Sequence, residues 1–169
     1  MTRKVVFCTL AGLLMLLSRP SAAQITTPSP LIGSWQLTLT PTTPPVTPPV
    51  IPIPGLATFT TDGSMIETDG TEVVPTRTTT ASPVFGTPGH GIWQPGPAIG
   101  NLYIQFISLL VNPNGSLHAK RLATITGTVD STGNNFSGTY TSDIADSSGQ
   151  TTVTSGTVTG LKIPHPALP

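Results

Sequence analysis

Turn-forming residues divide the chain from Leu31 onward into short apolar runs, and this regular spacing of turns constrains the fold more than any other feature of the sequence. Runs rich in Val, Ile, Thr, Phe and Tyr that end at Gly, Asn, Asp or Pro are typical of β-strands. The expected strands are 31–39, 56–61, 64–68, 90–93, 101–111, 116–129, 136–146 and 150–163. We therefore predict an all-β protein that folds as a single up-and-down antiparallel eight-stranded β-barrel.

The N-terminus has the pattern of an export signal. Two basic residues precede an apolar run over residues 5–17, and Ser21 and Ala23 have the small side chains that a signal peptidase requires. The run is short for a bilayer span, and no second long apolar stretch follows it. We expect a signal peptide over residues 1–23, no membrane anchor, and a mature protein that is secreted or periplasmic.

The rest of the chain divides into a flexible leader (24–30), one barrel domain (31–163) and a C-terminal tail (164–169). Within the barrel domain, prolines crowd residues 40–54, so we expect a proline-rich loop without strand pairing there. That loop either lies across one barrel end or is a solvated excursion. A second irregular stretch is expected at residues 70–89.

Composition narrows the classes of partner. Without residues 1–23 the chain has no cysteine, and four basic residues stand against seven acidic ones, which gives a net charge of −3. Core burial and a closed hydrogen-bonded sheet must then replace disulfides. A sparse, net negative charge argues against nucleic acid as a partner.

Turn chemistry predicts which strand residues face one another. The segment 112–115 suits a type I turn with glycine in the left-handed position, which pairs Asn112 with Ser116. Counting back from this turn predicts three further pairs, namely Ile107 with Arg121, Gln105 with Ala123, and Tyr103 with Ile125. Odd-numbered side chains from Tyr103 to Val129 are thus expected to point into the barrel.

Three other turns complete the expected registers. Asp62-Gly63 predicts a two-residue hairpin with Phe59 opposite Ile66. The segment 146–149 pairs Ser142 with Thr154, and matching Val129 with Phe136 keeps one apolar face continuous. By these registers the even-numbered residues of strand 101–111 lie outside, where an apolar surface would need cover from the proline-rich loop or from a second copy of the chain: they include Leu102, Ile104, Phe106 and Leu110.

Arg121 is the most informative polar residue, because its expected position places a permanent charge on an apolar inward face. The expected polar neighbours on that face are Tyr103, Gln105, Tyr140, Ser142 and Thr154. We interpret this patch, with His90 at the barrel mouth, as a site that receives the carboxylate or carbonyl of an apolar ligand. Two other interpretations stay open: a bulge turns Arg121 outward, or Arg121 pairs with an acid such as Asp143.

Gly33-Ser34-Trp35 on the first expected strand, a long loop after it, the number of strands and Lys162 on the last strand together resemble the lipocalin-like, or calycin, barrels. In that family a tryptophan closes one barrel end and a basic side chain from the last strand packs on it. The resemblance thus implies a structural closure role for Gly33, Trp35 and Lys162. Segments 56–63 and 87–93 are also similar to exported bacterial lipocalin-like proteins without an assigned activity.

No motif for catalysis or for a cofactor is present. His90, His118 and His165 lack metal-ligand spacing, and we attribute the acids between Asp62 and Glu72 to turn chemistry, so no metal and no cofactor is expected. Asn114 and Asn135 begin glycosylation triplets that matter only in a eukaryotic secretory pathway.

We predict a binding protein for a small apolar or amphipathic molecule, held without chemical change in the barrel interior. One alternative is a cyclase or isomerase resembling the allene oxide cyclase barrels, in which Arg121, Tyr103 and Tyr140 orient a substrate. The other is a structural or adhesive module whose interior is filled by side chains. A homo-oligomer through the outer face of strand 101–111 is a further expectation.

Overall fold

The structure of the chain is a computed structural model. It describes residues 29–43, 50–70 and 84–164. The predicted signal peptide, most of the leader and most of the tail lie outside these residues, as does the centre of the proline-rich segment.

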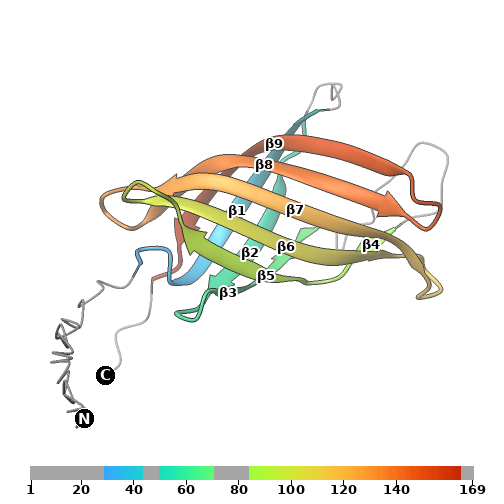
Figure 1. Cartoon of the computed structure of the whole chain (residues 1–169), viewed down its shortest axis with the longest axis horizontal. Helices are drawn as coiled ribbons and strands as arrows, with labels where there is room; N and C mark the ends of the chain where they lie inside the picture. The colour runs from blue at the N-terminus through green and yellow to red at the C-terminus, as the bar shows by residue number, and fades with distance from the viewer. Residues whose placement is uncertain (1–28, 44–49, 71–83, 165–169) are drawn as a thin grey trace, which may run out of the picture.

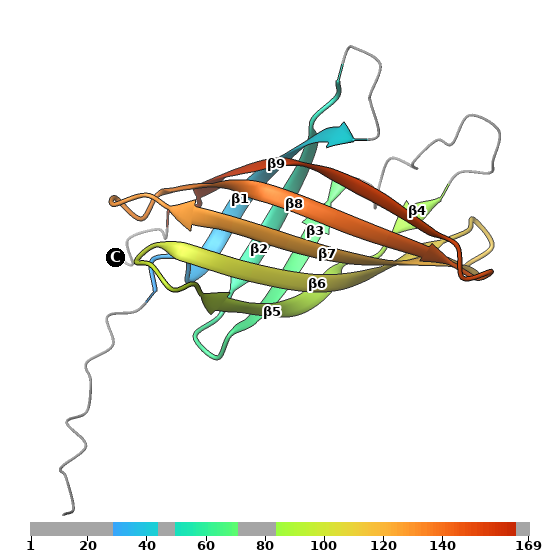
Figure 2. The same cartoon turned by 45° about the horizontal axis from the view of Figure 1, so that its top comes forward.

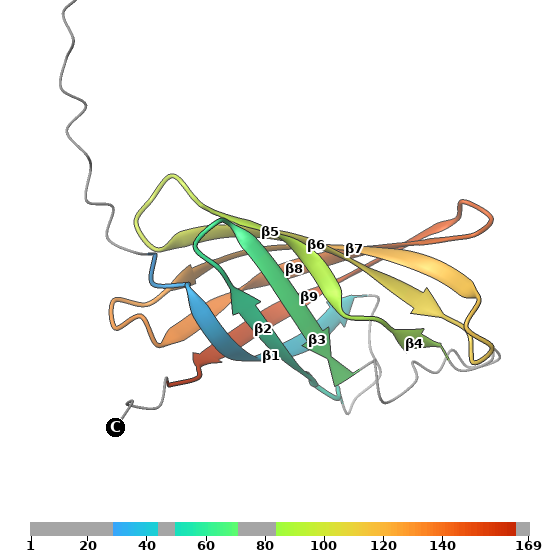
Figure 3. The same cartoon turned by 90° about the horizontal axis from the view of Figure 1, so that it is seen from below.

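The described residues form one antiparallel sheet that closes on itself. Each of the longer strands pairs with the next longer strand along the chain, while the two-residue strand β4 pairs with β6. The last strand, β9, returns to pair with β1, which closes the barrel (Figure 1). The strands are β1 (Gly33–Thr43), β2 (Ile53–Phe59), β3 (Ser64–Asp69), β4 (Phe85–Gly86), β5 (Gly89–Pro95), β6 (Asn101–Val111), β7 (Leu117–Val129), β8 (Asn135–Asp146) and β9 (Thr151–Lys162). In Figure 3, β1 to β3 cross in front of β6 to β9 at a steep angle, so the two groups of strands form the opposite walls.

The predicted up-and-down eight-stranded barrel is confirmed, because β4 and β5 act as one interrupted strand. Both pair with the same edge of β6, Gly86 opposite Leu110 and His90 opposite Ile107. Thr87 bridges the interruption: its N–H donates to the Leu109 carbonyl and its Oγ accepts the Leu109 N–H. The sequence predicts an irregular stretch over residues 70–89. This prediction is wrong for residues 85–86, which form β4, and for Gly89, which begins β5.

Two strands also extend into the segment expected to be free of pairing. β1 continues to Thr43 and β2 begins at Ile53, so residues 40–54 contribute to the barrel at both ends. Pro41 lies at an irregularity in the β1–β9 pairing, and Pro54 lies just beyond the β2–β3 pairing. A missing N–H is tolerated at such places, which is why proline does not end these strands.

The tight turns follow the predicted chemistry, with one difference. The Asn112 N–H donates to the Ser116 carbonyl and Gly115 has a φ of 82°, as the sequence indicates. The first hairpin has three loop residues instead of two, because Thr60 pairs with Ser64 and Gly63 takes the left-handed position. Phe59 therefore lies opposite Met65, and the predicted pair with Ile66 is wrong.

An irregularity after the 112–115 turn changes the register of β6 against β7. Val111 lies opposite Leu117 but Leu110 lies opposite Ala119, so His118 is an extra residue on β7. A bulge of one residue moves all later side chains of the partner strand to the other face. Arg121 consequently lies opposite Ser108, and the predicted pairs of Ile107, Gln105 and Tyr103 are wrong by one residue.

The two faces of β6 are therefore the reverse of those expected. Its inner face is formed by Leu102, Ile104, Phe106 and Ser108, all buried. Its outer face carries Tyr103 and Gln105, which are half-buried, and Ile107 and Leu109, which are 53% and 39% exposed. The expected inward positions on β7 are correct from Ala119 onward, since Ala119, Ala123, Ile125 and Val129 are buried, whereas Leu117, before the bulge, is 47% exposed. The registers of β8 are also confirmed, with Val129 opposite Phe136 and Ser142 opposite Thr154.

Apolar side chains fill the barrel at the end where β1 begins. Trp35 is fully buried and meets Phe136 edge-on, with the ring centroids 6.5 Å apart. Trp93 is also buried and donates its indole N–H to the Thr60 carbonyl. Figure 2 shows the described N- and C-terminal ends emerging at this same end of the barrel.

Gly91 is required by the close approach of β5 to β6. An added Cβ would overlap the Gln105 carbonyl oxygen and lie 2.6 Å from the Phe106 Cα, both on the backbone of β6. Gly91→Ala should lower the free energy of unfolding by more than about 3 kcal/mol, because the strands must part. Gly149→Ala is the control: it has open space and a φ of 86°, so only backbone strain of roughly 1–2 kcal/mol is expected. Equal losses in urea denaturation would contradict the steric argument.

Three turn carboxylates make stability depend on acid pH. Hydrogen bonds from Thr60 and Ser64 lower the pKa of Asp62 from 3.8 to about 2, and turn donors also lower the pKa of Asp130 and Asp146. Because these pKa values fall on folding, the stabilisation is present above pH 3.8 and is lost as the pH drops towards 2. The triple variant Asp62→Asn, Asp130→Asn, Asp146→Asn keeps the acceptor oxygens. Its urea midpoint should fall less than that of the native chain between neutral pH and pH 3; parallel curves would refute this assignment.

Candidate functional site

Trp35 and Lys162 meet at the filled end of the barrel. They are partners in the β1–β9 pairing, and the Lys162 ammonium lies 5.5 Å from the centroid of the Trp35 ring. The ammonium also donates to the Pro30 carbonyl at 2.7 Å, while the indole N–H donates to the Leu31 carbonyl at 2.7 Å. Gly33 has a φ of 122°, and an added Cβ would lie 3.3 Å from the Lys162 side chain. These contacts join the first and last strands and cover the core.

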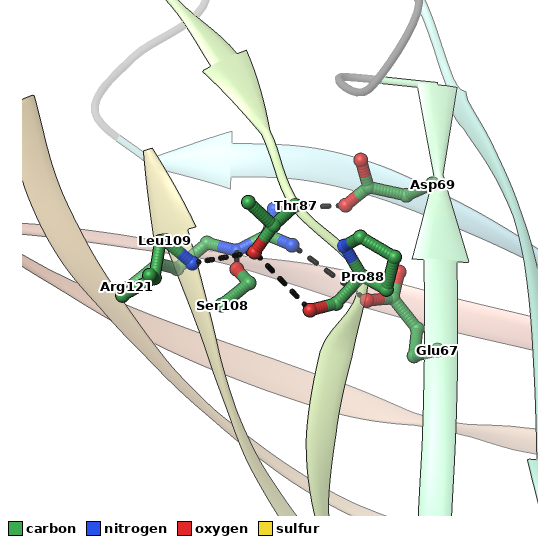
Figure 4. Close-up of polar contacts among 7 residues, drawn as sticks. All are labelled: Glu67, Asp69, Thr87, Pro88, Ser108, Leu109 and Arg121. Carbon is green, nitrogen blue, oxygen red and sulfur yellow. Dashed lines mark hydrogen bonds and ion pairs between the residues drawn. The ribbon is translucent and has the colours of Figure 1, made fainter. Parts of the chain in front are cut away.

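A buried ion pair crosses the other half of the barrel. Arg121 on β7 donates through one terminal nitrogen to Asp69 Oδ2 at 2.8 Å, and its second terminal nitrogen lies 3.6 Å from Glu67 Oε2 (Figure 4). Its Nε–H donates to Ser108 Oγ at 2.7 Å, and its guanidinium carbon lies 5.8 Å from the centroid of the Phe106 ring. The side chain of Arg121 is only 13% exposed and both acids are buried. The charge predicted to need a partner therefore has two.

Each partner is placed by strand alternation. Met65, Glu67 and Asp69 are alternate residues of β3, so once Met65 packs in the core both acids point into the barrel. Ser108 reaches Arg121 because of the bulge at His118, which pairs the two residues directly. Gly89 leaves room for the cluster, since a Cβ there would lie 2.9 Å from Glu67 Oε2 and 2.6 Å from the Phe106 ring.

Beside this cluster is a cavity of about 240 Å³. It lies toward the end of the barrel where β1 finishes and β2 begins. Its apolar wall is formed by Leu39, Ile53, Phe106, Leu110, Ala123, Ile125 and Ile144. Its polar lining is formed by Asp69, Arg121, Tyr140, Ser142 and Thr154, with Pro41 and Thr43 at the end of β1. A mostly apolar lining with a few polar groups is the usual composition of a small-molecule pocket.

Three hydroxyl groups of the polar lining lie on the adjacent strands β8 and β9. Ser142 and Thr154 are direct partners, and Tyr140 precedes Ser142 by two residues on the same face. Gly156 lies opposite Tyr140 and accommodates its ring, because a Cβ at that position would lie 2.7 Å from Tyr140 Cε1. Ser142 is 5% exposed, and its Oγ has no hydrogen-bond partner within residues 29–43, 50–70 and 84–164.

Tyr140 is held as a neutral phenol. Burial raises the pKa of its hydroxyl above the ordinary value of 10.0, and the charge of Asp69 acts in the same direction, while Arg121 opposes them. The group is therefore a hydrogen-bond donor at neutral pH.

The structure brings together four of the seven residues predicted to bind ligand. Arg121, Tyr140, Ser142 and Thr154 all line the cavity. Tyr103 and Gln105 lie on the outer face of β6, where their side chains meet each other at 3.4 Å, because the register of β6 differs by one residue. His90 is exposed on the outer face of β5, since Gly89, Gly91 and Trp93 occupy the inward positions of that strand.

Sequence reasoning missed the true partners of Arg121. Glu67 and Asp69 were attributed to turn chemistry, which explains Asp62 but not these two buried residues. The alternative partner Asp143 is exposed on β8, and Arg121 is not turned outward. The alternation of acids on β3, read together with an inward arginine, was the signal that could have identified the ion pair.

Metal-ligating groups do not gather within the described residues, where no cluster of three or more His, Cys, Asp or Glu side chains could hold an ion. Helices of the length and apolar character needed to cross a membrane are likewise not found in the described part of the chain.

Comparison with known proteins adds no homologue to this picture. No protein-family model matches the chain, and no similar curated protein or solved structure was found. The geometry of the barrel is therefore the basis of the functional argument.

The ion pair should dominate the energetics of this half of the barrel. Arg121→Met removes the guanidinium that faces two buried carboxylates, and breaking such a pair costs about 3–5 kcal/mol. The triple variant Arg121→Met, Glu67→Gln, Asp69→Asn removes the charges on both sides and should recover most of that loss. Urea denaturation of the two variants and the native chain measures this difference. An Arg121→Met chain as stable as the native one would contradict a structural role for the pair.

Proposed function

We propose that the chain is an exported, lipocalin-like binding protein that holds a small apolar or amphipathic molecule in the barrel interior. The observation that carries this proposal is the cavity of about 240 Å³ between an apolar wall and the Tyr140–Ser142–Thr154 side. A dry cavity of 150 Å³ accommodates benzene, so the volume here suits a molecule of about ten non-hydrogen atoms. The N-terminal sequence supports export, and the Trp35–Lys162 contact supports the likeness to lipocalins.

The two alternatives are weakened by different observations. An enzyme that orients its substrate through Arg121, Tyr103 and Tyr140 loses Tyr103, which lies outside the barrel. A module with a wholly filled interior fits the Trp35 end of the barrel but not the cavity beside Arg121. Binding without chemical change remains the function that the geometry supports best.

Association between copies of the chain through the outer face of β6 remains a separate proposal. The residues expected to form that surface lie inside the barrel, so the surface would consist of Ile107 and Leu109 with the neighbouring Ile92 of β5. These side chains are 39–57% exposed, which is compatible with a contact surface.

Binding can be tested by occluding the cavity without changing its polar groups. Ala123 lies on the cavity wall and is buried, so Ala123→Leu should fill much of the space. Nonan-2-one, which has a suitable size, should raise the melting temperature of the native protein and leave that of Ala123→Leu unchanged. Thr128→Leu on the exposed face of the same strand is the control and should respond like the native protein. Equal responses of all three proteins would show that binding, if any, occurs outside the cavity.

A further inference from the structure

The buried hydroxyl of Ser142 is the polar group of the cavity whose hydrogen bonding is incomplete. Its Oγ has no partner within the described residues, although the residue is only 5% exposed. A buried hydroxyl without a partner in the protein is unfavourable unless another molecule supplies a hydrogen bond. It lines the cavity rather than a closed part of the core, so a bound molecule can supply the missing partner.

The guanidinium of Arg121 is already engaged by groups of the protein itself. Asp69 accepts from it at 2.8 Å, Glu67 lies at 3.6 Å, and Ser108 accepts its Nε–H. A ligand carboxylate at this point would bring a third negative charge beside two buried ones, and it would lose its own hydration. This arrangement argues against the sequence-based expectation that Arg121 receives a ligand carboxylate.

We infer that the cavity binds a molecule with a neutral oxygen head group, a carbonyl or a hydroxyl, which pairs with the Ser142 hydroxyl while the apolar tail lies against the opposite wall. This inference rests on the proposed binding function and specifies its ligand class. The neighbouring groups suit the same head group, because Thr154 and Tyr140 carry further hydroxyls on that side of the cavity. Leu39 on β1 and Ile53 on β2 provide the apolar surface for the tail.

The first experiment compares ligands that differ only in the head group. Decane, nonan-1-ol, nonan-2-one and octanoate have the same number of non-hydrogen atoms, so they fill the cavity to a similar extent. Their dissociation constants for the native protein would be measured by isothermal titration calorimetry at neutral pH, where octanoate is ionised. Nonan-1-ol and nonan-2-one should bind about 3- to 10-fold more tightly than decane, which corresponds to one net hydrogen bond. Octanoate should bind more weakly than either.

The second experiment removes the hydroxyl. Ser142→Ala should abolish the preference for nonan-2-one over decane, and the ligand-free protein should be as stable as the native one or more stable, because an unpaired buried group is gone. Ser137→Ala, on the exposed face of the same strand, is the matched control and should keep the preference. A hydroxyl with a purely structural role would instead lower the stability of the ligand-free Ser142→Ala protein.

The outcomes separate the two proposals. If none of the four compounds binds, the proposed function fails. If octanoate binds most tightly, or if Ser142→Ala retains the native preference, a binding function stands but the inferred head group is wrong. Tighter binding of the alcohol and the ketone that depends on Ser142 supports both.

Discussion

The ion pair between Arg121 and the acids of β3 is the interaction on which the arrangement of the barrel interior depends. It links β7 to β3 across the lumen, and these strands belong to opposite walls in Figure 3. A permanent charge at a buried position is tolerated only with close and well-directed partners. Glu67, Asp69 and Ser108 must therefore all face inward at the same height as Arg121, which restricts the registers of three strands at once. Few alternative pairings of this sheet would satisfy the same requirement.

The ion pair also explains why the two ends of the barrel differ. At one end Trp35, Phe136 and Trp93 fill the interior with large rings. At the other, the space beside the ion pair is bordered by several small residues, among them Ala123, Ser142 and Thr154. Small side chains on neighbouring strands leave volume that the rigid Arg121 cluster cannot fill. The structure thus combines an end filled by aromatic side chains with a half that contains a cavity.

The sequence predicted those features that depend on short stretches of chain. Residues 112–115 and 146–149 specify their turns locally through glycine in the left-handed position and carboxylate or amide caps, and the closed eight-stranded order follows from strands joined by such turns. The bulge at His118 could not be predicted in this way, because it depends on how β6 and β7 pack in three dimensions. The apolar pattern did contain a signal: Leu102, Ile104 and Phe106 form a more apolar face than Tyr103, Gln105 and Ile107. The register counted from the 112–115 turn conflicts with this pattern, and it assigns the inner and outer faces of β6 the wrong way round.

The same reversal determines which chemistry the site can support. With the expected register, two further polar residues would have joined Arg121, and its guanidinium would have been exposed to a ligand. With the observed register, Ser108 and Phe106 take those places, and the guanidinium is held between a hydroxyl, two carboxylates and an aromatic ring. A charge fixed on several sides is a poor receptor for a mobile anion but a good support for neighbouring groups, because it cannot rearrange without losing several contacts. In the proposed function, the ligand is instead recognised by the hydroxyls of β8 and β9, which carry no charge. The one-residue bulge at His118 thus places Ser108 against Arg121 beside the cavity and leaves Tyr103 and Gln105 on the outer face of β6.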